Sequence, residues 1–203
     1  MANEPGTRRV LLETALNVIW ENSYGSTSVD DICRRAGVQK GSFYHFFPSK
    51  SDLAASALEE YWARYRQPEL DRVFSIQHPP VERLLNYCDQ VYDNQKKRFE
   101  RWGKVVGCPI SAMGSELSTQ DEKIRHKSEE IASRICRYFE AALRDAAREG
   151  LTKNHHIPER ARDFYSFVTG VLLQARIRND LEFVRVLKPA MRRLLALEES
   201  VAA

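Results

Sequence analysis

The most informative polar residues of this chain lie between positions 39 and 50. Gln39 can pair with the edge of adenine and Lys40 with that of guanine, while Ser42 can pair with several bases. Base edges are approached closely only where the first turn of a helix is small, and Gly41 and Ser42 allow this. These residue types, at this spacing, predict a surface that reads a DNA duplex.

A second group of side chains is suited to the phosphate backbone. Thr27 and Ser28 lie at an expected helix N-terminus, where backbone amides and the helix dipole favour an anion. Tyr44 and Lys50 are placed to contact phosphates, which positions a protein without reading sequence. His45 is expected on the same outer face. Taken singly, each residue is more simply interpreted as part of a solvated surface, but as a set they indicate DNA contact.

The elements that must position these groups can be built from residues 26 to 50. Ser28 and Asp31 have capping-box spacing at the start of a helix. Gly37 suits the left-handed position that follows the end of that helix. The next helix would turn three aromatic rings inward and would end before Pro48. Two short helices joined by a glycine turn predict a helix-turn-helix; the inward rings are Phe43, Phe46 and Phe47.

Residues 8–62 resemble the N-terminal domain of TetR-family transcriptional regulators, and the matching run extends from Ser28 to Leu53. Its core is Gly37-Val38, Lys40 to Phe47 and Ser49-Lys50. The resemblance implies an all-helical homodimer that represses genes until a small molecule binds the larger C-terminal domain. Its partner would be double-stranded operator DNA, near-palindromic, with half-sites about one helical turn apart.

Composition limits the other possibilities. The chain has 203 residues, 43% hydrophobic and 29% charged, which is typical of a globular protein, and its net charge is +3. Residues 1–66 contain equal numbers of basic and acidic side chains, so recognition must depend on a few placed groups. Without a signal peptide or a long apolar run, we expect a soluble, cytoplasmic protein that does not associate with a membrane. Four cysteines without CxxC spacing predict reduced thiols and neither zinc nor disulfides, and we expect no metal, cofactor or catalytic residue.

The apolar spacing predicts an all-α fold. We expect a helix-turn-helix DNA-binding domain over 1–50, a connecting helix over 51–66, and an effector-binding and dimerisation domain over 67–203. Helices are expected over 7–23, 48–66, 121–149 and 158–178, with further helical spacing after 81 and after 180. Gln67-Pro68 is expected to be a break, and Pro189 a kink or break.

The last two helices carry broad apolar faces that would form a four-helix bundle with a second copy of the chain. The alternative is that these faces only close the core of one chain. The family resemblance favours the dimer, whose expected interface residues are Phe164, Phe167, Val171, Phe183, Leu187 and Met191.

Cys108 is the candidate sensor of an effector. It precedes Pro109, which favours the first position of a helix, so the thiol would lie at a helix N-terminus where a thiolate is stabilised. This segment and Leu173 to Arg176 resemble a TetR-family subgroup that includes the regulators of N-ethylmaleimide reductase. The resemblance implies a small-molecule, electrophilic or oxidising effector, although Arg176 stands where regulators of this subgroup have lysine. Trp102 and Met113 are candidate pocket residues, with a core position as the alternative.

Two other functions remain open from the sequence. A thiol-based enzyme or peroxide scavenger could use Cys108, but it would need a base near the thiol and a resolving cysteine. An architectural DNA-binding protein would need no effector, which leaves the C-terminal domain with little purpose.

Overall fold

The computed structural model describes residues 4–21, 24–152 and 156–195, and these residues form helices and turns without a strand. The all-α class predicted from the sequence is therefore confirmed. The chain divides into two compact units, which we describe separately. The first comprises Met1–Gln67 with Cys108–Ile131, and the second Pro68–Gly107 with Ala132–Ala203. The expected domain limits at 50 and 66 stay a prediction.

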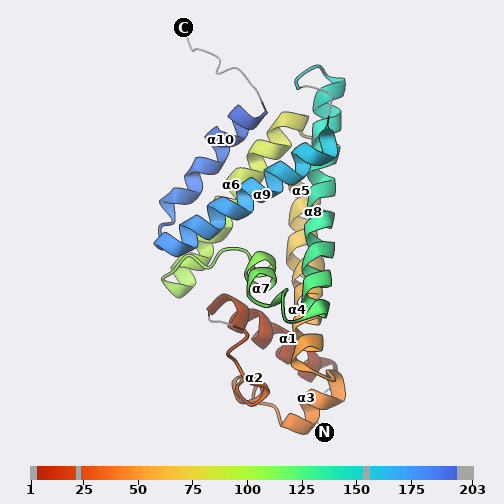
Figure 1. Cartoon of the computed structure of the whole chain (residues 1–203), viewed down its shortest axis with the longest axis vertical. Helices are drawn as coiled ribbons and strands as arrows, with labels where there is room; N and C mark the ends of the chain where they lie inside the picture. Colours follow the sequence, from red (N-terminus) through yellow and green to blue (C-terminus); the bar gives the residue numbers. More distant parts are fainter. Residues whose placement is uncertain (1–3, 22–23, 153–155, 196–203) are drawn as a thin grey trace. The chain divides into compact units, whose positions relative to one another are not determined.

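The first unit is organised around α1 (Glu4–Glu21), which packs against α2 (Val29–Ala36), α4 (Lys50–Tyr61) and α7 (Pro109–Leu117) (Figure 1). The helix expected over 7–23 begins three residues earlier, and residues 22–23 lie outside the described residues. Apolar residues of α1 at helical spacing meet those of the next three helices, including α3 (Lys40–Phe46). The core contains Leu11, Leu12, Ala15, Val18, Ile19, Ile32, Phe43, Leu53 and Leu58.

The expected break at Gln67-Pro68 is wrong. Helix α4 continues through a π-helical turn, Trp62–Arg66, into α5 (Gln67–Val73). The amide of Gln67 bonds to the carbonyl of Trp62, five residues back. Proline lacks the N–H of a regular helix and its ring collides with the carbonyl four residues earlier. The wider π turn immediately before Pro68 relieves this collision, so the helix continues.

The second unit contains α6 (Pro80–Trp102), α9 (Ile157–Arg178) and α10 (Leu187–Leu194), with α10 packed against the other two (Figure 1). A 3-10 turn, η2 (Glu182–Val186), precedes α10. Pro189 lies in the first turn of α10, where its missing N–H costs nothing.

The long helix expected over 121–149 is confirmed as α8 (Glu122–Arg148), and both units include part of it. In the second unit its Phe139 joins an aromatic cluster with Phe74 and Tyr87. The ring centroids of Tyr87 and Phe139 are 4.9 Å apart at 83°, an edge-to-face contact. Phe74 lies 5.6 Å from Phe139 and 5.8 Å from Tyr87. These rings join α6 and α8 in one core.

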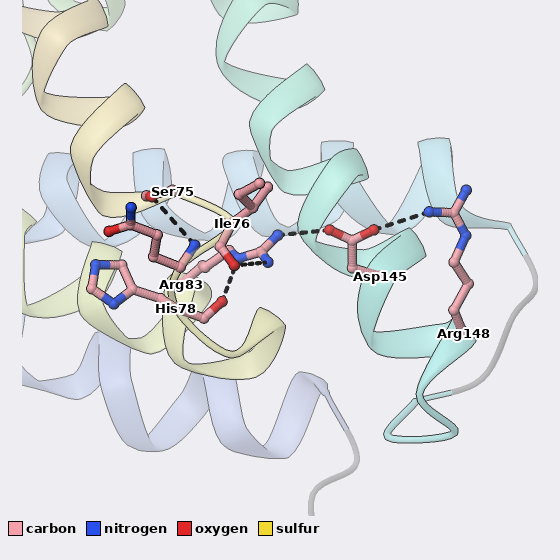
Figure 2. Close-up of polar contacts among 7 residues, drawn as sticks. Ser75, Ile76, His78, Arg83, Asp145 and Arg148 are labelled. Carbon is pink, nitrogen blue, oxygen red and sulfur yellow. Dashed lines mark hydrogen bonds and ion pairs between the residues drawn. The ribbon is translucent and has the colours of Figure 1, made fainter.

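A buried arginine ties the loop between α5 and α6 to α8 (Figure 2). Arg83 donates from Nε to the His78 carbonyl at 2.8 Å and from a terminal nitrogen to Asp145 at 2.7 Å. A longer contact, 3.4 Å, reaches the carbonyl of Ile76. A buried charge is costly unless hydrogen-bond partners replace the water that it loses. The guanidinium of Arg83 finds these partners in both the loop and α8, and it therefore holds the two together.

Candidate nucleic-acid interface

Helix α2 begins and ends with the signals expected from its sequence. The amide of Asp31 donates to Ser28 Oγ at 3.1 Å, and the amide of Ser28 donates to the Asp31 carboxylate at 3.3 Å. The hydrogen bond from the Ser28 hydroxyl lowers the pKa of Asp31. Gly37 follows the helix in the left-handed region at φ 66°, and the amide of Val38 bonds back to Cys33. Both ends of α2 are therefore fixed by local chemistry.

The buried rings of Phe43 and of Phe47, the C-cap residue, anchor helix α3, so that its polar residues face outward. Phe43 and Phe47 are buried, whereas Tyr44 and His45 are exposed, and Phe46 is intermediate. Gln39 is the N-cap residue, but its side chain makes no capping hydrogen bond.

Gly41 is exposed, and a Cβ built there would meet nothing within 4 Å. Gly41 is also not one of the described glycines that have a positive φ. Neither packing nor backbone conformation within the chain requires glycine here, and the absence of a side chain leaves room for a partner that approaches the helix.

Basic side chains of this region are mostly paired with acids. Lys40 Nζ lies 2.9 Å and 3.1 Å from the two carboxylate oxygens of Asp30, and this hydrogen bond raises the pKa of Lys40. Arg35 pairs with Glu21 at 3.0 Å, and Arg34 with Asp31. Such exposed pairs contribute about 0–1 kcal/mol each, so phosphates can displace them at little cost.

Lys50 occupies a different environment from the one expected. Its ammonium donates to the carbonyls of Tyr24 at 3.0 Å, Gly25 at 3.0 Å and Thr27 at 2.8 Å. An ammonium has three protons, and here each has an acceptor within the chain. Partial burial lowers the pKa of Lys50. Thr27 is also buried, with 9% of its surface exposed, while Ser28 remains exposed.

A contact that the sequence gave no means of finding joins this region to α7. The backbone amide of Gly25 donates to Glu116 Oε1 at 2.7 Å. The two residues are 91 positions apart, so no local spacing predicts that they meet. The contact becomes visible only in the folded chain, where these distant segments meet.

The candidate effector residues have separate surroundings. Cys108 is the N-cap of α7 with Pro109 next, as expected, but its sulfur makes no capping hydrogen bond. Met113 on the same helix is fully buried, in the manner of a core residue. In the second unit, the guanidinium of Arg101 lies 4.7 Å from the centroid of Trp102. The Cδ of Arg176 lies 3.7 Å from the place that a Gly107 Cβ would take.

All four cysteines are free thiols, but their exposure differs. Cys33, Cys88 and Cys136 are buried, and burial raises the pKa of each, that of Cys88 to about 12. Cys108 is the partly exposed one. Within the described ranges, no three His, Cys, Asp or Glu side chains gather as a metal site.

Most of the expected dimer-interface residues are buried within the single chain, and their role in a dimer stays a prediction. Leu187 and Met191 expose none of their surface, Phe164 exposes 2% and Val171 7%. They close the core of a single chain, because both helices turn their broadest apolar faces onto the rest of the unit. Phe167 and Phe183 are intermediate. The apolar residues left exposed on these two helices are Leu173, Ile177 and Leu194, with 51%, 69% and 43% of their surface accessible.

Family models match most of the chain. The model of bacterial regulatory proteins of the tetR family matches residues 11–57, and that of the tetracyclin repressor-like C-terminal domain matches residues 80–191. The chain therefore belongs to the TetR family of transcriptional regulators, and DNA binding follows at the level of the family. The resemblance drawn from residues 28–53 is confirmed.

Individual relatives agree with this assignment. The Escherichia coli K12 HTH-type transcriptional repressor NemR is 26% identical over 185 residues, which cover 88% of each chain. An HTH-type regulator from the lacX 3' region of Lactococcus lactis subsp. lactis is 26% identical over 181 residues, again 88% of each. These relatives are transcriptional regulators, and the expected resemblance to the repressor of N-ethylmaleimide reductase is confirmed.

Solved structures show the same fold. The reduced form of E. coli NemR superposes with a TM-score of 0.79 at 26% identity, covering 93% of this chain and 97% of that one. A TetR regulatory protein from Rhodobacter sphaeroides gives a TM-score of 0.81 at 24% identity, covering 92% and 97%. Across the described residues, no helix combines the length and apolar character needed to cross a membrane.

Proposed function

We propose that this protein is a homodimeric repressor that binds a palindromic operator through α3 and the start of α2. The observation that carries the proposal is the outer face of α3: an exposed glycine with no internal role, flanked by Gln39, Lys40 and Ser42. A helix reads base edges with small and polar residues in its first turn. Tyr44 and His45 extend this face toward the phosphate backbone, as does Ser28 at the N-terminus of α2.

Two of the expected DNA contacts take an indirect role in this proposal. Thr27 is buried and Lys50 is saturated by three carbonyls, so both fix the turn that leads into α2. They position the reading residues, and the phosphate contacts fall to Ser28, Tyr44 and His45.

We also propose that modification of Cys108 releases the protein from DNA. Cys108 is the partly exposed thiol, and the other three cysteines are buried. The similar NemR has been crystallised in what is described as its reduced form, which names a redox state of that protein. A small electrophile reaching Cys108 would have to favour the state with lower operator affinity, since a ligand shifts an equilibrium only by its differential affinity. Trp102, Met113 and Arg176 remain candidates for the residues around the effector.

Exposed apolar residues support the dimer. Leu173 and Ile177 lie four residues apart on α9, on one face of the helix, and each exposes more than half of its surface. Large apolar side chains clustered on a surface favour a protein contact over solvent. A second copy of the chain would bury them and would place two α3 helices on successive half-sites.

A gel shift or fluorescence anisotropy titration with the DNA upstream of the gene, at stated salt, tests the proposal. We expect a specific complex with the unmodified protein. Gln39→Ala with Tyr44→Ala should weaken it at least about thirtyfold, since each lost base or phosphate contact costs about 1–3 kcal/mol. Lys97→Ala, an exposed lysine outside the helix-turn-helix, is the control. A double variant that binds the DNA with unchanged affinity would refute the proposed interface.

A thiol enzyme built on Cys108 is the competing function. Multiple turnover of peroxide with an added reductant would support it, whereas one modification per chain with altered DNA binding supports sensing. The relatives, all regulators, favour sensing.

A further inference from the structure

The segment from the end of α7 to the start of α8 holds the helix-turn-helix by polar contacts. Besides the Gly25–Glu116 hydrogen bond, the hydroxyl of Ser51 donates to the carboxylate of Asp121. Lys123 Nζ donates to Asp52 at 2.6 Å, and this hydrogen bond lowers the pKa of Asp52. We call these contacts the polar clasp; its members are Gly25, Ser51 and Asp52 on one side and Glu116, Asp121 and Lys123 on the other.

The clasp holds the turn before α2 and the first turn of α4. Gly25 lies three residues before Ser28, the N-cap of α2, and Asp52 belongs to the capping hydrogen bonds of α4 with Ser49. Glu116 binds the amide of Gly25, while Lys50 binds its carbonyl. The turn before α2 is thus held from α7 on one side and from α4 on the other.

Close approach at Gly25 explains why glycine suits this position. A Cβ added to Gly25 would lie 2.7 Å from Glu116 Oε1 and 3.2 Å from a methyl group of Leu117. Real Cβ atoms do not come so near, so any larger residue would push the carboxylate away from the amide. Gly25→Ala is therefore a way to open the clasp without changing Glu116.

Helix α7 connects this contact to Cys108. Its nine residues span about 13 Å, with Cys108 as the N-cap and Glu116 in the last turn. Gly114 lies against α8, because a Cβ on Gly114 would be 3.4 Å from the Cβ of Ser128. We therefore expect α7 to transmit a shift at Cys108 to Glu116, because close-packed interiors transmit strain.

We propose that Glu116 is the positioning residue through which α7 holds the turn before α2 in its DNA-binding arrangement. A displacement of α7 at Cys108 would withdraw the carboxylate from Gly25 and free that turn. The inference rests on the proposed release by Cys108 modification, and it assigns the step between the thiol and the reading helix. The energy available is modest, since one charge-assisted hydrogen bond contributes about 1.5–3 kcal/mol, yet that equals a tenfold or larger change in affinity.

The test compares operator affinity before and after treatment with N-ethylmaleimide, by fluorescence anisotropy. The variants are Glu116→Ala, which removes the acceptor, Glu116→Gln, which keeps an acceptor oxygen, and Gly25→Ala. Glu100→Ala, an exposed glutamate of α6, is the matched control. The wild type and Glu100→Ala should lose affinity about ten- to thirtyfold on treatment. Glu116→Ala and Gly25→Ala should bind about tenfold more weakly before treatment and should respond less than threefold, while Glu116→Gln should retain most of the response.

The outcomes separate the two proposals. A wild type whose affinity does not change on treatment overturns release by Cys108 and the inference with it. A responsive wild type together with an equally responsive Glu116→Ala overturns the inference alone. Thermal unfolding of each variant distinguishes a local effect from loss of the fold. If Glu116→Ala does not fold, the response of Gly25→Ala decides whether the inference holds.

Discussion

Tyr24 and Lys50 bind each other's backbone. The hydroxyl of Tyr24 donates to the carbonyl of Lys50, and the ammonium of Lys50 donates to the carbonyl of Tyr24, each at 3.0 Å. The ammonium also lies 5.0 Å from the centroid of the Tyr24 ring. Burial raises the pKa of Tyr24, so its hydroxyl stays a donor at any pH used for assay. This pair joins the turn before α2 to the start of α4.

Removal of the Tyr24 hydroxyl should therefore destabilise the protein. We expect Tyr24→Phe to lower the free energy of unfolding by about 1–2 kcal/mol, because the carbonyl of Lys50 loses a buried donor. Urea denaturation measures this change. Tyr65→Phe, at a tyrosine with 52% of its surface exposed, should change the free energy by less than about 0.5 kcal/mol. Equal losses in the two variants would contradict the role given to the pair.

Asp30 restrains Lys40, so Asp30→Asn should strengthen operator binding. The substitution frees the ammonium and removes a negative charge beside the DNA. We expect about three- to tenfold tighter binding and a steeper salt dependence, since each added phosphate contact changes the slope of log K against log salt by about 0.9. Titrations at several salt concentrations measure both. Asp163→Asn, an exposed aspartate on α9, is the control, and an unchanged slope in Asp30→Asn would argue against a contact between Lys40 and DNA.

Native cysteine labelling should be selective for Cys108. Burial raises the pKa of the Cys33, Cys88 and Cys136 thiols, so they remain protonated and shielded at pH 8. Because burial disfavours the Cys88 thiolate, the fold should lose stability as pH rises above the ordinary thiol pKa toward the folded pKa of about 12. Mass spectrometry after brief N-ethylmaleimide treatment should show one adduct per chain, and four in guanidinium. Prompt labelling of Cys108→Ser would contradict this assignment.

Asp145 takes part in two ion pairs that differ in burial (Figure 2). Its contact with buried Arg83 is 2.7 Å, and its contact with Arg148, 77% exposed, is 3.1 Å. We expect Asp145→Ala to cost about 2–3 kcal/mol of unfolding free energy, because it removes one partner of a buried guanidinium. Arg148→Ala should cost less than about 0.5 kcal/mol. Thermal or urea unfolding compares the two, and an equal effect would refute the importance of burial.

Exposed Ile177 gives a test of the proposed dimer. Ile177→Asp should raise the dimer dissociation constant at least about a hundredfold, because a carboxylate would have to be desolvated at the contact. Ile76→Asp is the matched control, since Ile76 exposes 86% of its surface in the loop before α6. Sedimentation measures the oligomeric state. An Ile177→Asp protein that dimerises like the control would place the interface elsewhere.

Much of the reading helix is determined by the sequence alone. The capping pair Ser28 and Asp31, Gly37 and the inward Phe43 and Phe47 act within a few residues, so local spacing predicts α2 and α3 correctly. The same holds for Cys108 and Pro109 at the start of α7. These features also carry the family resemblance, and therefore the class of function.

Tertiary structure decided what depends on distant partners. Pro68 is accepted inside a helix because a π turn precedes it. The broad apolar faces of α9 and α10 are buried in the core of one chain and are not exposed for contact with a second copy. Lys50 looked like a phosphate contact, yet three carbonyls surround it. The Gly25–Glu116 hydrogen bond joins residues 91 positions apart. Sequence spacing reports periodicity and caps, whereas the choice of partner for a charge or an apolar face is made only when remote segments meet.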